Sequence, residues 1–274
     1  MENKKIIMVR HHPMHLPFTN KVYLNQLGEG VDPNDVIFID ATSRNRDFDF
    51  IKEISPFYVG PVVASDGKVS KTLENFWQFG KVYEGKTIFH HYISRRQKED
   101  LEFVCSDEEG NPTEDWFKVR DYGFNIDHGY RHPFSGKPLY QYYVEDGKVV
   151  RLGYIESRKK VYIKEYAKLV YNSSSFKRIK KLLDEGKTIA LVDFDAYNYY
   201  DHDVMVKRYE ADKKRFGSSF SYSLNDYLNI KTMKDVVNFP GLLMGHGFVL
   251  KLLLQGDIEV VNGEVIDHSH VLDI

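Results

Sequence analysis

The residues best suited to chemistry lie between Thr72 and Tyr83, in the stretch TLENFWQFGKVY. Placed on a helix at about 100° per residue, Glu74, Gln78 and Lys81 fall at positions i, i+4 and i+7 and stack along one face. A carboxylate, an amide and an amine in one row can act in acid–base catalysis or bind a polar substrate. The same spacing is typical of a solvent-exposed face with a Glu–Lys pair, and that interpretation stays open.

The segment around this row predicts how it is positioned. Ser70 or Thr72 can cap the helix, which places Glu74 in the first turn, where the helix dipole favours an anion. The preceding loop, SPFYVGPV at 55–62, supplies Phe57 and Tyr58 and favours a catalytic row at the rim of an aromatic pocket. An apolar packing stripe lies beside the row and consists of Leu73, Phe76, Trp77 and Gly80.

These motifs resemble a known signature. Ser55-Pro-Phe-Tyr58, a turn at Gly67, and then the helix with Glu74, an aromatic pair and Lys81 are similar to the opening of the NADAR (NAD- and ADP-ribose-associated), or YbiA-like, family. The resemblance runs in order from about 55 to 254. It implies a helix-rich α+β fold of the YbiA-like kind in a single domain, 1–274, with a core at about 36–120 and 157–255. The segment 121–156 does not fit that core and is interpreted as an insertion containing a β-hairpin.

Two later stretches extend the resemblance. Trp116 and Arg120, at i and i+4 on a predicted helix, match a Trp and an Arg of the family pattern, and can hold a pyrophosphate or stack on each other as a packing pair. Near the C-terminus, a buried helix is predicted within 240–254. The family carries an Arg where this chain has Gly-His-Gly, which leaves the role of His246 open.

Polar residues also follow two predicted strands. Val36–Asp40 leads into a turn containing Arg44, and Lys187–Asp193 leads into a segment containing Asn198. Polar groups at strand ends commonly reach a ligand phosphate, and Arg binds its oxygens in a fork. The alternatives are an exposed loop around Arg44 and a cap role for Asp193.

Further elements follow from periodicity and turn residues. We expect a strand at 5–9, a hairpin at 139–155 with an Asp-Gly turn, and short strands around 258–261. Helices are expected at 158–171 and 173–183, the second ending at Gly186, while 201–215 is a surface helix or loop. The run Ser94–Lys98 is typical of a solvated helix face, and 107–115 of a loop.

Composition limits the function classes. The 274 residues are 42% hydrophobic and 28% charged, with a net charge of −2, which argues against a broad electrostatic nucleic-acid binder. The 19 Tyr and 18 Phe are suited to packing and to stacking on bases. Cys105 is the only cysteine, so no disulfide framework and no thiolate metal site are expected.

A metal site and a membrane location are not expected. His11, His12 and His15 cluster, but Pro13 interrupts them and no Cys or carboxylate lies near, so we predict no metal and no cofactor. The charged N-terminus has no long apolar run after it, and no stretch reaches the roughly 18 apolar residues of a membrane span. We expect an intracellular, cytoplasmic protein with no membrane partner.

Three functions fit these observations. The first is a hydrolase: an N-glycosidase that removes ADP-ribose from a nucleobase such as guanine, as the resemblance implies, with Glu74 stabilising an oxocarbenium-like state and activating water. Lys81 would bind a substrate oxygen or keep Glu74 ionised. The alternatives are a DNA glycosylase-like enzyme that acts on a modified base and a non-catalytic module that binds ADP-ribose or a similar nucleotide.

The candidate site is therefore defined as follows. The catalytic candidates are Glu74, Lys81 and Asp193, and the substrate-binding candidates are Arg44, Ser55, Phe57, Tyr58, Trp77, Gln78, Trp116, Arg120, Asn198 and His246. The partner is an ADP-ribose-containing or other N-glycosidic nucleotide, with nucleic acid as a further candidate.

Overall fold

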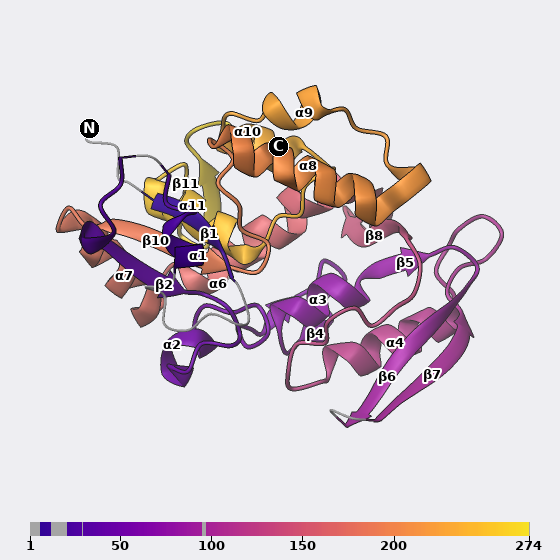
Figure 1. Cartoon of the computed structure of the whole chain (residues 1–274). Coiled ribbons are helices and arrows are strands. Elements are labelled where there is room, and N and C mark those ends of the chain that lie inside the picture. Colours follow the sequence, from indigo (N-terminus) through magenta and orange to yellow (C-terminus); the bar gives the residue numbers. More distant parts are fainter. Residues whose placement is uncertain (1–5, 12–20, 29, 95–96, 274) are drawn as a thin grey trace. The chain divides into compact units, whose positions relative to one another are not determined.

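The computed structural model describes residues 6–11, 21–28, 30–94 and 97–273. Over these residues the fold is mixed α+β with several small sheets, as expected (Figure 1). The chain forms two compact units: the first comprises Met1–Ile51 and Tyr171–Ile274, and the second Lys52–Val170. The predicted core and insertion boundaries of a single domain stay a prediction.

A three-stranded parallel sheet lies at the centre of the first unit. Its strands are β1 (Ile6–Arg10), β10 (Thr188–Asp193) and β2 (Val36–Asp40), in the order β1-β10-β2. The register pairs Ile6 with Ile189 and Thr188 with Val36, so all three strands end at the same edge. The three strands expected from apolar runs are confirmed. Because parallel strands present their carboxyl ends together, the polar residues that follow them gather there.

Helices and a hairpin complete the first unit. Tyr23 and Leu27 pack on one face of the sheet against Ile7, Val9 and Val192. The elements are α1 (Lys21–Leu24), η1 (Pro33–Asp35), α2 (Phe48–Lys52), α7 (Ser174–Asp184), α8 (His202–Phe216), η3 (Gly217–Ser219), α9 (Leu224–Leu228), α10 (Met233–Asn238), α11 (His246–Gln255), β11 (Ile258–Val261) and β12 (Glu264–Asp267).

Local signals located most of these elements. Ser173 caps α7 by accepting a hydrogen bond from the Phe176 N–H, and Asp201 caps α8 in the same way through Val204. The buried helix near the C-terminus is shorter than expected, because α11 begins only at His246. Leu242 and Leu243 precede it in an irregular segment, so their apolar character reflects packing and not helical periodicity.

The second unit contains α3 (Leu73–Phe79), which carries the predicted catalytic row, and the elements around it. Thr72 is the N-cap, and Gly80 ends the helix after seven residues. The expected helix over 72–83 is therefore too long, and Lys81 lies in the following strand β5 (Lys81–Tyr83). The other elements are β3 (Val62–Val63), β4 (Val69–Ser70), β6 (Lys86–Ser94), β7 (Gln97–Val104), α4 (Glu114–Phe124), β8 (Pro138–Glu145), β9 (Lys148–Leu152), α5 (Tyr154–Ser157), η2 (Arg158–Ile163) and α6 (Lys164–Val170).

The expected hairpin is present as β8 and β9. Glu145 pairs with Lys148, and Asp146 and Gly147 both have positive φ in the connecting turn, as a two-residue Asp-Gly turn requires. β8 also pairs with β5 through Lys81 and Gln141. The segment interpreted as an insertion thus supplies two of the three strands of the sheet that begins directly after α3.

The described residues of the charge run, Ser94, Gln97 and Lys98, lie in the strands of a hairpin, so the interpretation as a helix face is wrong for them. β6 and β7 pair antiparallel from Lys86–Val104 to Ser94–Gln97. The residues of β7 are nearly all exposed, so charged side chains face solvent on a strand as they would on a helix. A run of charged residues predicts exposure to solvent, but it does not show whether the segment is a helix or a strand.

Candidate functional site

The predicted polar row exists as a chain of hydrogen bonds. Gln78 Nε2 donates to Glu74 Oε1 at 2.9 Å, and Lys81 Nζ donates to Gln78 Oε1 at 2.8 Å. Glu74 and Gln78 are 7% and 9% exposed, so the carboxylate and the amide lie largely out of water. The interpretation of this row as a solvent-exposed face is therefore wrong.

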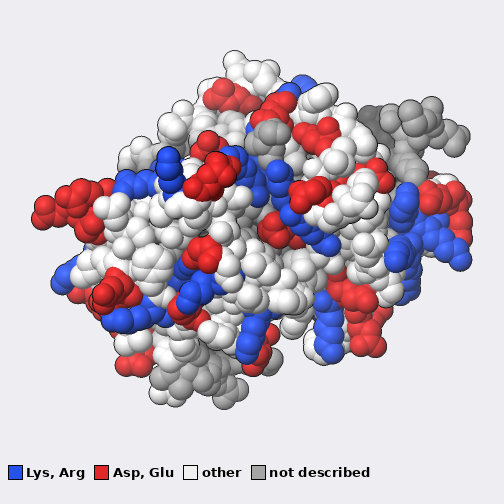
Figure 2. Space-filling model, turned by 180° about the vertical axis from the view of Figure 1, so that it is seen from behind, with Lys and Arg blue, Asp and Glu red and all other residues white. Residues whose placement is uncertain are grey.

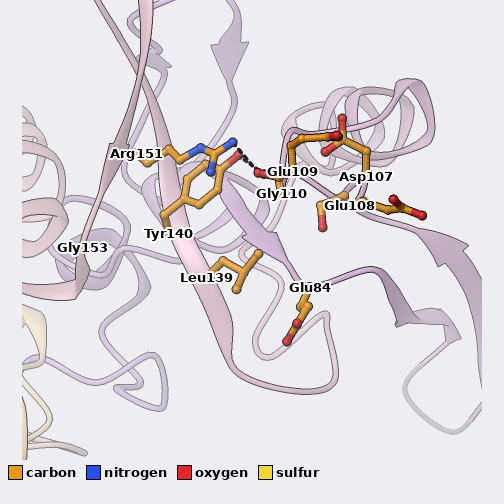
Figure 3. Close-up of a pocket in the computed structure, with 10 residues that line it drawn as sticks. Glu84, Asp107, Glu108, Glu109, Gly110, Leu139, Tyr140, Arg151 and Gly153 are labelled. Carbon is orange, nitrogen blue, oxygen red and sulfur yellow. Dashed lines mark hydrogen bonds between the residues drawn. The ribbon is translucent and has the colours of Figure 1, made fainter.

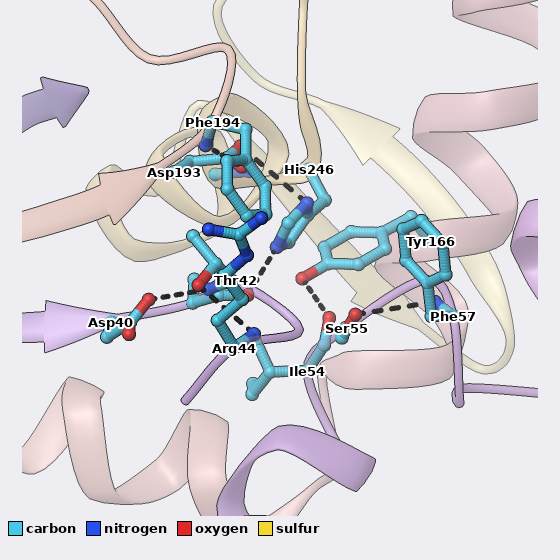
Figure 4. Close-up of polar contacts among 12 residues, drawn as sticks. Asp40, Thr42, Arg44, Ile54, Ser55, Phe57, Tyr166, Asp193, Phe194 and His246 are labelled. Atoms are coloured by element: carbon cyan, nitrogen blue, oxygen red, sulfur yellow. Dashed lines mark hydrogen bonds and ion pairs between the residues drawn. The ribbon is translucent and has the colours of Figure 1, made fainter. Parts of the chain in front are cut away.

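The loop before α3 is held against the start of that helix. The Glu74 N–H donates to the Pro56 carbonyl and the Leu73 N–H to the Val59 carbonyl, each at 2.9 Å. Ser55 is fully buried, and its hydroxyl accepts the Phe57 N–H, as Figure 4 shows. The structure thus brings Ser55, Phe57 and Tyr58 to the N-terminus of the helix that carries Glu74.

Lys81 lies in an aromatic and largely apolar setting. Its ammonium is 4.8 Å from the centre of the Trp77 ring, which favours the cation. Burial lowers the pKa of Lys81 to about 8, and the Glu74 carboxylate partly opposes this shift. An amine with this pKa changes charge close to physiological pH.

A π-helical segment packs against α3. η2 follows α5 and leads directly into α6, so Tyr154–Val170 is almost continuous helix with a widened middle. Tyr162 in this segment lies 5.2 Å from the Trp77 ring and 6.4 Å from Tyr166, centre to centre. π-Helical turns are rare and frequently occur at functional sites. Helical periodicity predicted the helix but gave no signal for the widening.

Trp116 and Arg120 form a packing pair on α4. Trp116 is fully buried and its indole N–H donates to the Lys81 carbonyl at 2.9 Å. Arg120 lies 5.4 Å from the Trp116 ring and forks onto Asp66, with Nη2 to Oδ1 at 3.1 Å and a second bond from Nη1 to Oδ2. The structure shows the packing alternative, while contact with a pyrophosphate stays a prediction.

Asn75 is a residue that sequence reasoning missed. Its amide nitrogen donates to the Ile126 and His128 carbonyls at 3.1 and 2.9 Å, and its amide oxygen accepts the Tyr130 N–H at 2.7 Å. Gly129, inside the loop so held, donates to the Phe57 carbonyl at 2.9 Å. Asn75 therefore ties α3 to the loop that supports Phe57. The sequence shows only an Asn next to Glu74 in a predicted helix, and its burial and its three long-range hydrogen bonds are visible only in the structure.

Asp193 caps α11 in the first unit. Its Oδ2 accepts the Gly247 N–H at 2.9 Å, and its Oδ1 accepts the Phe194 N–H at 2.7 Å (Figure 4). A Cβ on Gly245 would lie 2.3 Å from Asp193 Oδ2, so glycine at this position allows the close approach. The structure shows the cap alternative for Asp193, and a catalytic role stays a prediction.

His246 is buried, and both of its ring nitrogens have a partner in the first unit. His246 Nε2 lies 2.7 Å from the Ala41 carbonyl, to which it donates, and Nδ1 lies 3.6 Å from Asp193 Oδ2. Through these two contacts His246, which is 6% exposed, connects the end of β2 with the end of β10. Substrate binding by His246 is untested by these contacts.

Arg44 and Asn198 lie in the loops after β2 and β10. The exposed Arg44 guanidinium is 5.5 Å from the centre of the Phe194 ring. Asn198 Oδ1 accepts the Tyr200 N–H at 3.3 Å. The candidates Arg44, Asp193, Asn198 and His246 belong to the first unit, and the other nine belong to the second.

Only one of the three clustered histidines near the N-terminus, His11, is among the described residues. His12 and His15 lie outside the described residues, whereas His11 contacts the Phe194 ring at 4.8 Å. In the described residues, no three or more His, Cys, Asp or Glu side chains are grouped to hold a metal ion. No helix in the same described ranges combines the length and the apolar character needed to cross a bilayer.

A pocket of about 470 Å³ lies elsewhere in the second unit (Figure 3). Arg151 lines it and donates to the Glu109 carbonyl, above the Tyr140 ring. Its carboxylates would repel a diphosphate, and its lining includes none of the candidate residues. The acidic lining residues are Glu84, Asp107, Glu108 and Glu109.

No protein family model matches the chain, and no curated protein and no solved structure matches it either. The likeness to the NADAR family therefore rests on the motifs quoted above. On the face shown in Figure 2, basic and acidic side chains are interspersed. This agrees with the net charge of −2 and gives no support on that face to a broad nucleic-acid surface.

Proposed function

We propose that the protein is an N-glycosidase that hydrolyses the bond between ADP-ribose and a nucleobase nitrogen, with Glu74 as the catalytic carboxylate. The observation that carries the proposal is the largely buried chain from Glu74 through Gln78 to Lys81 on α3 and β5. Cleavage of a ribosyl–nitrogen bond passes through an oxocarbenium-like state, which a nearby carboxylate stabilises. A carboxylate kept from water acts more strongly on that charge than an exposed one.

The surrounding residues support this assignment. Gln78 orients the Glu74 carboxylate, and Lys81 fixes the orientation of Gln78 by donating to its oxygen. Trp77, Phe57 and Tyr58 provide partly exposed rings near the same helix, suited to contact with a nucleotide.

The function is tested by a release assay. Purified protein is incubated with guanine-ADP-ribosylated DNA, and free ADP-ribose is quantified by chromatography, alongside calorimetric titration with ADP-ribose. Release of ADP-ribose by the wild type supports the glycosidase. Binding without release would assign a non-catalytic nucleotide-binding module, and absence of both would refute the ADP-ribose substrate class.

The pH dependence of release tests the role of Lys81. Because burial lowers the pKa of Lys81 to about 8, the ammonium that donates to Gln78 is lost as pH rises through that value. We expect the release rate to fall above about pH 8 by roughly tenfold per pH unit. Lys81→Arg keeps the positive charge to higher pH and should move the decline upward. A profile that stays flat from pH 7 to 9.5 would contradict the assigned role.

A further inference from the structure

Three side chains of the second unit form a Ser–His–Asp chain that the proposed function does not use. Ser135 Oγ lies 2.9 Å from His90 Nε2, and His90 Nδ1 lies 2.8 Å from Asp100 Oδ1. His90 is on β6, Asp100 is its partner on β7, and Ser135 lies between α4 and β8. A nucleophile, a base and an acid that orients the base, each within hydrogen-bond reach, define a catalytic triad by geometry and not by sequence order.

The backbone fixes Ser135 beside His90. The His90 N–H donates to the Pro133 carbonyl at 2.7 Å, and the Ser135 N–H to the Ile88 carbonyl at 3.1 Å. Thr87 Oγ1 donates to the Ser135 carbonyl at 2.9 Å. These bonds on both sides of the Phe89–Phe134 bridge hold the nucleophile and the base in one arrangement.

Packing of Phe134, the residue before Ser135, also holds this segment in place. Phe134 is 8% exposed and contacts the rings of Phe79, Tyr83 and Phe89 at 5.4, 5.2 and 5.8 Å. The Tyr130 hydroxyl donates to the His90 carbonyl from the same cluster. Sites positioned on packed, hydrogen-bonded elements hold catalytic geometry better than free loops.

Two neighbouring groups bear on the reactivity. Lys98 Nζ lies 3.1 Å from Asp100 Oδ1 and 3.2 Å from His90 Nδ1. We assign the Nδ1 hydrogen to the bond with Asp100, because a carboxylate can only accept; Lys98 then donates to the same carboxylate oxygen and not to Nδ1. In this tautomer Nε2 is free to take the proton of Ser135. The Gly136 N–H makes no hydrogen bond within the described ranges, and its position directly after the serine is that of an oxyanion donor in other serine hydrolases.

We propose that Ser135, His90 and Asp100 form a serine esterase site for unhindered carboxylic esters. Ser135 Oγ attacks the ester carbonyl while His90 Nε2 takes the hydroxyl proton, and the alcohol leaves with that proton. Water, deprotonated by His90, then hydrolyses the acyl-serine, which releases the acid and restores Ser135. Asp100 is 45% exposed, so the site is open and offers little binding energy for the more demanding cleavage of amides.

The test uses a fluorophosphonate probe, whose phosphorus Ser135 Oγ attacks with loss of fluoride. We expect a single adduct that peptide mass spectrometry places on Ser135. Ser135→Ala should abolish it, and His90→Asn should slow it by at least about 100-fold. Ser219→Ala, which changes an exposed serine of the first unit, should leave it unchanged. No adduct on folded wild type, or equal labelling of His90→Asn, would overturn the proposal.

A second measurement does not depend on the probe. Ser135→Cys places a thiol beside His90, and Cys105, the only native cysteine, is buried. A thiol next to an imidazole ionises at lower pH, so we expect iodoacetamide to alkylate this variant at pH 6 at least about tenfold faster than Ser219→Cys. Equal rates would show that His90 does not act as a base toward position 135. Neither measurement involves ADP-ribose, so the outcome is independent of the proposed glycosidase.

Discussion

Replacing Glu74 with glutamine is expected to slow ADP-ribose release by about 10²- to 10⁴-fold while ADP-ribose binding stays within about threefold of the wild type. The new side chain has the same size, and its carbonyl oxygen can still accept the hydrogen bond that Gln78 Nε2 now gives to Glu74 at 2.9 Å. What is lost is the negative charge that stabilises the oxocarbenium-like state and activates water. The rate is measured by chromatography of released ADP-ribose, and binding by calorimetry.

Glu84→Gln provides the matched control. Glu84 is an exposed glutamate shortly after β5, so the substitution removes the same charge from the same unit without touching the row on α3. Its release rate should equal that of the wild type. If Glu74→Gln released ADP-ribose at nearly the wild-type rate, Glu74 would not be the catalytic carboxylate, and the buried row would have a structural role.

Replacing Lys251 with methionine is expected to raise the free energy of unfolding at pH 7 by about 1–2 kcal/mol. Lys251 on α11 is 2% exposed, and burial lowers its pKa from 10.5 to about 8. At about 1.4 kcal/mol per pKa unit, the buried ammonium costs about 3 kcal/mol at pH 7. The Tyr199 and Tyr200 rings, 4.9 and 5.1 Å away, return about 1–2 kcal/mol through cation–π contacts that methionine would not make.

The stability cost of the buried Lys251 ammonium depends on pH. Between about pH 8 and 10.5 the unfolded chain holds the Lys251 proton and the folded protein does not, so stability rises with pH in this window. Below about pH 8 both states are protonated and the full cost is present. Urea unfolding at pH 7 and pH 9.5 should therefore show an advantage of Lys251→Met that shrinks at the higher pH. Lys231→Met, at an exposed lysine, is the control, and a destabilised Lys251→Met would contradict the expectation.

Local sequence signals predicted the elements well where the cause is local. Thr72 and Ser173 cap helices because a hydroxyl directly before the first helical residue accepts a free backbone N–H of the first turn. Asp146-Gly147 fixes the β8–β9 turn through its positive φ angles. Three apolar runs became the strands of the parallel sheet, because β-branched residues in short blocks suit a buried strand.

Helical spacing also predicted that Glu74 and Gln78 share one face of the helix, and the structure shows a hydrogen bond between them. Spacing placed Lys81 beside Gln78, which is correct, but it placed Lys81 on the helix. Gly80 ends the helix, and Lys81 contacts Gln78 from the strand that follows. Spacing also could not decide whether the row is exposed. Burial depends on what packs on α3: the preceding loop at 55–59 bonds to its first turn, and η2, which is distant in the chain, contacts it through Tyr162 and Trp77.

The mixed α+β composition, the helix caps, the β8–β9 turn and the placement of Glu74 and Gln78 on one face can be predicted from the sequence, because neighbouring residues control them. The folded arrangement is needed to see that Asp193 caps a helix 54 residues away and that Ser135 contacts His90 across 45 residues. The same holds for the pairing of β5 with β8. Such contacts depend on which elements pack together, and side-chain periodicity within one segment carries no information about its partner.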